Sequence, residues 1–148
     1  MTPPAPRLAT LACTAPGCAA LCSETWHGAS PQALPHLGVT FNLPHAETHT
    51  IVLPDAIAYN EDHAKAQTAR ISFALGVEGT VPGAALALYD LAVELGAPTA
   101  LESLGVGEGD MQRAADIALQ NPYWNPAPIE HDAILKLLSN ALQGNRPA

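Results

Sequence analysis

From Val39 onward, apolar residues recur every three to four positions in segments that end at glycine or proline. This spacing puts the apolar side chains on one face of a helix, whereas a half-buried strand needs strict alternation. No alternating or β-rich run interrupts the pattern. The sequence therefore predicts an all-α fold, a helical bundle, over residues 39–148.

Six segments carry the helical spacing, and we expect Pro54 to interrupt the first of them because proline lacks an N–H. The expected helices are Ala46–Asn60, Asp62–Leu75, Pro82–Leu95, Ala97–Leu104, Gly109–Gln120 and Ile129–Leu142. Glycines that follow several of them favour helix ends there. The residues expected on buried faces are Ala64, Ala69, Ile71, Phe73, Leu75, Leu86, Tyr89, Leu91, Val93, Leu95, Met111, Ala114, Ala115, Ile117, Ala118, Ile134, Leu137, Leu138 and Leu142.

Residues 1–38 lack any sustained period and are expected to form an irregular, disordered segment. Three cysteines, Cys13, Cys18 and Cys22, all lie in this segment. The prolines near the start and the short apolar stretch argue against a secretory signal, so a disulfide framework is not expected. Three unrelated thiols are the favoured interpretation, although the spacing is also a weak metal cue.

The charge balance excludes some partners. The formal net charge is −8, and only 6 residues are Lys or Arg, so no basic patch is available for phosphates of nucleic acid. No apolar run is long enough to cross a bilayer. The sequence therefore predicts a cytoplasmic protein that binds neither nucleic acid nor membrane.

The histidines cluster around the start of the first helix, and two of them are candidate site residues. His45 and His49 are four positions apart, which places both imidazoles on one helix face. Together they could bind a metal or a substrate anion, but most such pairs are solvated or capping groups. The true H-E-x-x-H zinc motif is absent, because Glu47 does not follow the first histidine directly.

Two other features stay open from the residues alone. Asn121–Pro126 puts two aromatic residues between Asn-Pro dipeptides, which cannot be helix interior. The rings either fill a space in the core, which we favour, or line the entrance to a substrate site. Asp55, directly after Pro54, either caps a kink or faces a pocket, whereas Asp90, Glu94 and Glu102 are expected on exposed helix faces.

Several motifs in order resemble the maleylacetate reductases, a branch of the iron-containing alcohol dehydrogenase superfamily. They are Thr40–Thr50, Val52–Pro54, Ala58–Asn60, Tyr89–Ala92, Leu95–Leu101 and Asn121–Pro126. The resemblance covers about three quarters of the chain and implies the helical C-terminal domain of these enzymes. The family reduces maleylacetate, a small dicarboxylate, to 3-oxoadipate with NADH or NADPH during the breakdown of aromatic compounds, and usually forms homodimers.

The resemblance also implies roles for the two histidines. In the superfamily an Asp and three His hold a divalent metal, Fe or Zn, and the last His matches His45 in the Pro44-His45 pair. His45 and His49 could instead bind the substrate carboxylates or relay a proton. No glycine-rich phosphate-binding turn is present, so no cofactor-binding residue is assigned, and we expect the chain to be a fragment that is inactive alone.

The segment before Val39 departs from the family. A metal-ligand histidine is expected within a string like H-H-K-L-C-H-T-L-G, but Ser30–Gly38 reads S-P-Q-A-L-P-H-L-G. With suitable codons, a shift of one base converts one string into the other. We therefore hypothesise that a frameshift replaced the native sequence of residues 1–38, which the gene's DNA would test. A non-catalytic helical module for interaction or dimerisation is the alternative function.

Overall fold

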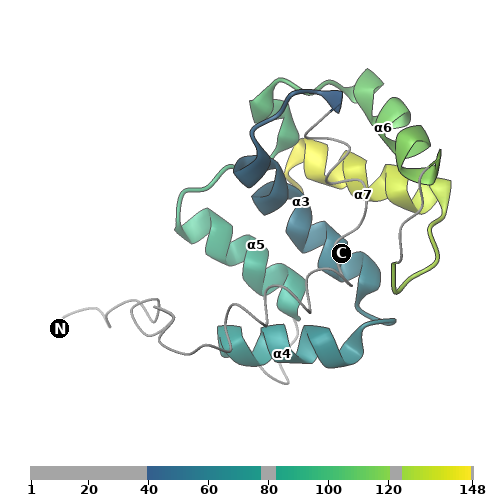
Figure 1. Ribbon diagram of the computed structural model, residues 1–148. Helices are drawn as coiled ribbons and strands as arrows, with labels where there is room; N and C mark the ends of the chain where they lie inside the picture. The colour runs from purple at the N-terminus through teal and green to yellow at the C-terminus, as the bar shows by residue number, and fades with distance from the viewer. Residues whose placement is uncertain (1–39, 78–82, 121–124, 148) are drawn as a thin grey trace.

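The computed structural model describes residues 40–77, 83–120 and 125–147. Within these ranges the chain forms five α-helices, one 3-10 helix and no strand (Figure 1). The all-α prediction is confirmed, and each α-helix begins within three residues of its predicted start. The elements are α3 (His45–Asn60), α4 (Lys65–Leu75), α5 (Ala84–Glu94), η2 (Leu101–Leu104), α6 (Glu108–Gln120) and α7 (His131–Gln143).

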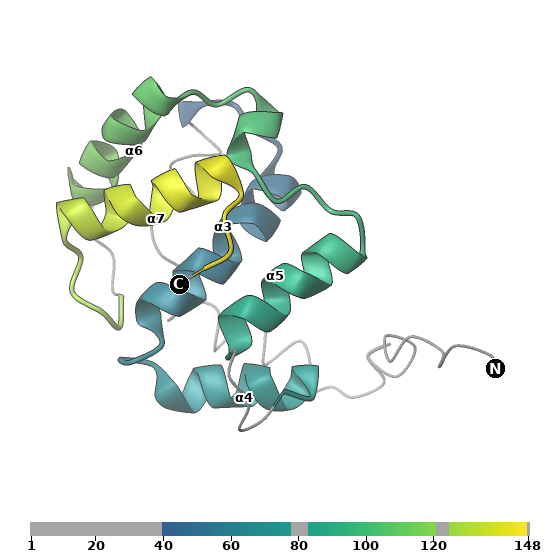
Figure 2. The same ribbon diagram turned by 180° about the vertical axis from the view of Figure 1, so that it is seen from behind.

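The helix α3 is the centre of the arrangement. It packs against α5 on one side and against α7 on the other, and α6 covers α7 while α4 covers α5. The two opposite views agree on this order, with α4 and α5 grouped apart from α6 and α7 (Figures 1 and 2). Its position makes α3 the shared wall of two apolar clusters.

The larger cluster joins the first half of α3 to η2, α6 and α7. Its members on α6 and α7 recur at helical spacing, which is why these helices were predicted with the correct buried face. Of the predicted positions only Ile117 is half-buried rather than buried. The confirmed buried residues are Met111, Ala114, Ala115, Ala118, Ile134, Leu137, Leu138 and Leu142.

The predicted buried faces of α4 and α5 are only partly correct. Ala64 is buried, and Ile71, Leu75, Leu86, Tyr89 and Leu91 are half-buried. Phe73, Val93 and Leu95 are 68%, 54% and 60% exposed, and Ala69 is exposed as well. The smaller cluster instead forms around Ile57 with the alanines that begin α5. Leu53, Ile71 and Leu88 pack against this cluster as partly buried side chains, whereas Phe73, Val93 and Leu95 lie outside it. Within α4 only Thr68 is buried, because the helix lies on the outside of α5.

The prediction that Pro54 interrupts the first helix is also wrong, because α3 continues through it as one element with Pro54 buried. The glycine stops are confirmed. Gly76, Gly105 and Gly144 follow α4, η2 and α7 in the left-handed conformation. Within the described ranges, no helix is long and apolar enough to cross a membrane.

Hydrogen bonds and an ion pair join the residues after α7 to α5. The Tyr89 hydroxyl donates to the Gly144 carbonyl oxygen at 2.7 Å, and the Arg146 guanidinium donates to both carboxylate oxygens of Asp90 at 2.6 and 2.7 Å. These contacts with α5 require a sharp turn of the chain at Gly144, where φ is +68°.

Exchange of Gly144 for alanine should therefore destabilise the fold more than the same exchange at Gly105. A Cβ at Gly144 would lie 3.0 Å from the Ala100 Cβ and 3.1 Å from the Thr99 oxygen, whereas nothing lies within 4 Å at Gly105. We expect losses of about 2 to 3 kcal/mol and about 1 kcal/mol in the free energy of unfolding, respectively, since both positions strain alanine but only one also crowds it. Urea denaturation of both variants measures this difference, and equal losses would contradict it.

Candidate functional site

The start of α3 carries the two candidate histidines. Asn42, with φ +51°, turns the chain just before the helix, and Pro44 occupies the N-cap position without a side-chain cap. Thr48 supplies the local restraint. Its backbone N–H and its hydroxyl both donate to the Pro44 carbonyl oxygen, at 3.0 and 2.8 Å. Because Thr48 is fully buried, this first turn is fixed against the larger cluster.

His45 and His49 lie together on one face of this turn, as the four-residue spacing predicted. Their ring centroids are 4.1 Å apart and the ring planes are inclined by 49°. The His45 side chain is exposed and that of His49 is half-buried. The pair therefore has one imidazole in contact with solvent and one directed inward.

His49 has an unsatisfied polar atom. Its Nε2 is buried and has no hydrogen-bond partner among the described residues. Burial lowers the pKa of His49 from its ordinary value of 6.5, and the neighbouring His45 lowers that pKa further. A buried polar nitrogen without a partner is costly, and such sites often serve binding or catalysis. A neutral imidazole can donate one hydrogen bond and accept another, so His49 can bind a polar group or transfer a proton.

The titration of His49 should show this environment directly. We expect its pKa below 6.5 by NMR of the histidine ring nuclei. Exchange of His45 for glutamine should raise the pKa of His49, because it removes a neighbouring positive charge, but only partly, because burial is the larger cause. A His49 pKa at or above 6.5 in the unchanged chain would contradict this account.

The donor set does not form a metal site by itself. Imidazole nitrogen suits iron and zinc. However, the described part of the chain contains no group of three His, Cys, Asp or Glu that could hold a metal ion. The pair supplies at most two of the four ligands that a zinc site normally has. We therefore derive no chemical step through a metal from these residues.

Asp55 lies away from the pair, between α3 and α7. It is 7% exposed, and the Asn140 amide donates to its carboxylate at 3.3 Å. Burial raises the pKa of Asp55 to about 6, and the bond from Asn140 lowers it by less. Of the two interpretations that the sequence left open, capping is wrong. Asp55 packs within the fold, so its pKa affects stability.

The end of α3 contacts the residues that directly follow the Asn-Pro segment. The Asn60 side chain donates to the Ala56 oxygen at 3.0 Å and accepts the Ala127 N–H at 3.1 Å, and the Tyr59 hydroxyl donates to the Pro128 oxygen. The residue types alone did not predict these contacts. The expected position of the two aromatic rings lies outside the described residues, as do His36 and the three cysteines.

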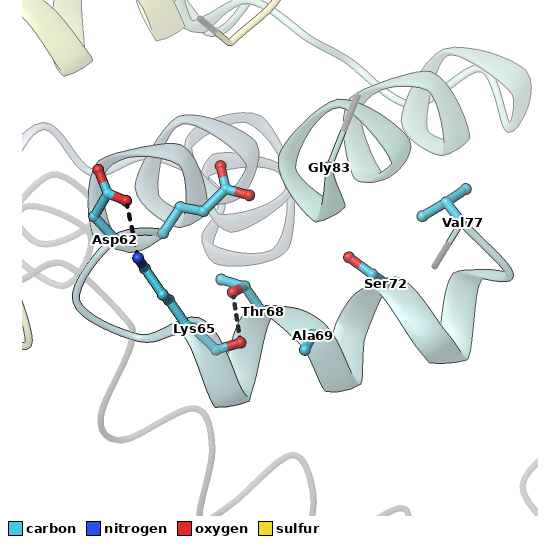
Figure 3. Close-up of a pocket in the computed structure, with 8 residues that line it drawn as sticks. Asp62, Lys65, Thr68, Ala69, Ser72, Val77 and Gly83 are labelled. Carbon is cyan, nitrogen blue, oxygen red and sulfur yellow. Dashed lines mark hydrogen bonds and ion pairs between the residues drawn. The ribbon is translucent and has the colours of Figure 1, made fainter. Parts of the chain in front are cut away.

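The remaining polar candidates are at the surface. Asp90, Glu94 and Glu102 are exposed as predicted, and His63 is exposed too. A pocket of about 350 Å³ lies between the end of α3 and α4, lined in part by Glu61, Asp62 and Lys65 (Figure 3). It lies beyond the opposite end of α3 from His45, so it is not part of the histidine site.

A comparison with known protein families shows which family the chain belongs to. Residues 12–142 match the model of the iron-containing alcohol dehydrogenase family, C-terminal. The chain belongs to this family. Its helices thus correspond to the C-terminal domain of iron-containing alcohol dehydrogenases. The matched range begins before Gly38, and the frameshift proposed for residues 1–38 remains a hypothesis that the gene's DNA tests.

Individual members of the iron-containing alcohol dehydrogenase family are also similar to this chain. A maleylacetate reductase of Burkholderia cepacia is 48% identical over 112 residues, which are 76% of this chain and 31% of that protein. The structure of maleylacetate reductase from Agrobacterium tumefaciens matches with a TM-score of 0.70 at 45% identity, over 78% of this chain and 32% of that one. An iron-containing alcohol dehydrogenase from Corynebacterium glutamicum gives 0.69 at 33% identity, over 82% and 33%. The chain spans about a third of the length of these relatives.

Proposed function

We propose that this chain is the C-terminal domain of a maleylacetate reductase, which reduces maleylacetate to 3-oxoadipate with NADH or NADPH. The observation that carries the proposal is the His45–His49 pair, with its unpartnered buried nitrogen, in a segment that resembles these reductases. The similarity to maleylacetate reductases at about half identity supports it.

In this proposal the two histidines act on the substrate. The reaction adds one hydride and one proton, and the nicotinamide supplies the hydride when bound. His49, held neutral by burial, hydrogen-bonds the substrate through Nε2. His45, exposed to solvent, contacts a substrate carboxylate or passes a proton to the site. His45 is also the residue that the resemblance implies as a metal ligand. The iron or zinc content of a His45→Gln variant tests that role.

We propose further that the isolated chain does not turn over, because hydride transfer requires a dinucleotide positioned against the substrate. The test is a reductase chimera, in which residues 40–148 of this chain replace the matching C-terminal part of the Burkholderia cepacia relative. We expect maleylacetate-dependent oxidation of NADH by the chimera and none by the chain alone. A folded chimera that binds NADH but lacks turnover would refute the proposed function.

A second candidate is a non-catalytic interaction module, favoured by the exposure of Phe73, Val93 and Leu95. The same chimera discriminates between the two candidates. A helical domain without substrate contacts should not support turnover, whereas a reductase domain should. Self-association of the chain does not decide the matter, because a reductase domain can also dimerise.

A further inference from the structure

The residue three positions before His45 has an unusual backbone conformation. Asn42 has a φ of +51°, and in the described ranges 40–77, 83–120 and 125–147 it is the single non-glycine residue with a positive φ. A Cβ atom disfavours this left-handed region, although asparagine adopts it more readily than most residues. Left-handed non-glycine residues persist where the surrounding structure determines them, and they cluster at functional sites. The place of Asn42 beside the histidine pair therefore requires an explanation.

The side chain of Asn42 does not provide that explanation. It is exposed to solvent and forms no hydrogen bond within the part of the chain that the structure describes. The N-cap position of α3 is occupied by Pro44, so Asn42 is not a capping residue either. What matters at Asn42 is therefore its backbone, which sets the direction in which the chain continues toward α3.

The backbone at Asn42 lies between two side chains that reach the core. Phe41 and Leu43 are both half-buried, and both pack against the larger apolar cluster. Phe41 and Asn42 form a turn directly after the helical residue Thr40. A left-handed residue at such a turn redirects the chain and lets the residue after it return to the apolar side. The entry to α3 is thus anchored to the core on both sides of Asn42.

The two residues between Asn42 and His45 leave the chain little freedom. Leu43 precedes a proline, which confines its backbone to extended conformations, and the ring of Pro44 restricts its own φ, which is −63°. The Pro44 carbonyl oxygen then accepts both hydrogen bonds from Thr48. Because each step of this path is restricted, a change of the backbone at Asn42 would displace the start of α3 relative to the core.

The histidine pair is sensitive to such a displacement. His45 is the first residue of α3, whereas His49 lies one turn further along the helix and its Nε2 is buried. The ring centroids are 4.1 Å apart, so a shift of the first turn by part of that distance would move His45 out of contact with His49. We propose that Asn42 is a positioning residue for the histidine pair: its left-handed backbone fixes the start of α3 and thereby holds His45 against His49. Its effect on turnover rests on the proposed function, whereas the geometry of the pair does not.

Exchange of Asn42 for valine tests the geometry in the full chain by NMR. Valine is branched at Cβ and strongly disfavours a positive φ, and because Asn42 is exposed, the exchange removes no buried side chain. The unchanged chain should show cross-relaxation between the ring protons of His45 and His49, and Asn42→Val should lose it. Asn42→Gly should retain it, because glycine adopts the left-handed conformation without steric conflict.

The reductase chimera tests the effect of Asn42 on turnover. Asn42→Val should lower kcat/KM for maleylacetate at least about tenfold, because a small displacement of a group that acts on the substrate is costly. Asn42→Gly should restore kcat/KM to within about twofold of the unchanged chimera. This rescue distinguishes a role of the backbone from a role of the asparagine side chain, which both variants lack.

A glycine elsewhere provides the matched control. Gly76 also has a left-handed backbone, with φ +71°, and it ends α4, which packs mainly against α5. Gly76→Val introduces the same unfavourable backbone conformation away from the pair. It should therefore reduce stability toward urea without changing the cross-relaxation of the histidine rings or the turnover of the chimera.

Four outcomes decide the proposal. Retention of the cross-relaxation by a folded Asn42→Val variant would overturn it, and so would loss of the cross-relaxation in Asn42→Gly. If circular dichroism shows that Asn42→Val does not fold, Asn42→Ala takes its place, because alanine is unbranched and opposes a positive φ less strongly. Lost cross-relaxation with unchanged turnover would overturn the role of Asn42 in the reaction. A chimera without turnover before any exchange at Asn42 refutes the proposed function and leaves the NMR test of Asn42 intact.

Discussion

Exchange of His49 for glutamine in the reductase chimera is expected to lower maleylacetate turnover by about two to four orders of magnitude while the helices stay intact. Glutamine is close to histidine in size and keeps a hydrogen-bonding group, but it cannot accept and release a proton. The unpartnered Nε2 of His49 is the atom that the change removes. The measurement is kcat and KM, with circular dichroism to check the fold.

The companion variant His45→Gln identifies the role of the exposed imidazole. If His45 contacts a substrate carboxylate, KM should rise more than kcat falls and the metal content should not change. If His45 ligates a metal, the bound iron or zinc should fall as measured by mass spectrometry. His63→Gln is the matched control, because His63 is exposed and lies apart from the pair. Turnover by His49→Gln equal to that of the control would remove His49 from the catalytic account.

The site lies on a rigid part of the fold, which favours a binding role. Ile51 and Val52, within the next turn after His49, are buried in the larger cluster together with α6 and α7. Thr48 fixes the carbonyl before His45. A side chain that is held by packing and by local hydrogen bonds keeps its position without the cost of ordering it when a ligand binds. The second half of α3 packs against the smaller cluster.

The sequence predicted the fold best where burial is set by long side chains at regular spacing. On α6 and α7, Met111, Leu137 and Leu138 mark the buried face without ambiguity. On α5, the apolar residues surround the helix, and those that pack in the cluster around Ile57 of α3 are Ala84, Ala85 and Leu88. Periodicity identifies a helix in such a segment but not its orientation, because alanine contributes little to an apolar pattern.

At the candidate site, the contact between residues close in sequence was predictable, whereas the contacts between distant residues were not. The spacing of His45 and His49 predicted their contact, because residues four apart in a helix are neighbours. The contact between Asp55 and Asn140 joins residues 85 positions apart, and that between Asn60 and Ala127 joins residues 67 apart. No local pattern encodes such pairings. They depend on how α3 packs against α7 and the loop before it, which only the three-dimensional structure provides.

Exchange of Asp55 for asparagine should stabilise the chain at neutral pH. Burial raises the pKa of Asp55 from 3.8 to about 6, so the folded state disfavours the ionised carboxylate. Below pH 3.8 the group is protonated in both the folded and unfolded states and imposes no penalty. Between 3.8 and about 6 only the unfolded chain releases the proton, so stability falls as pH rises. Above about 6 the penalty is complete and amounts to about 3 kcal/mol at most.

Asparagine does not ionise, and its carbonyl oxygen can still accept the Asn140 amide. We therefore expect Asp55→Asn to raise the free energy of unfolding by about 1 to 3 kcal/mol at pH 8 and to leave it nearly unchanged at pH 4. Urea denaturation at the two pH values measures this. Asp62→Asn is the matched control, since that carboxylate is exposed and should show no comparable gain. A gain at pH 4 equal to that at pH 8 would show that the effect comes from packing, because the removal of a buried charge acts only where the carboxylate is ionised.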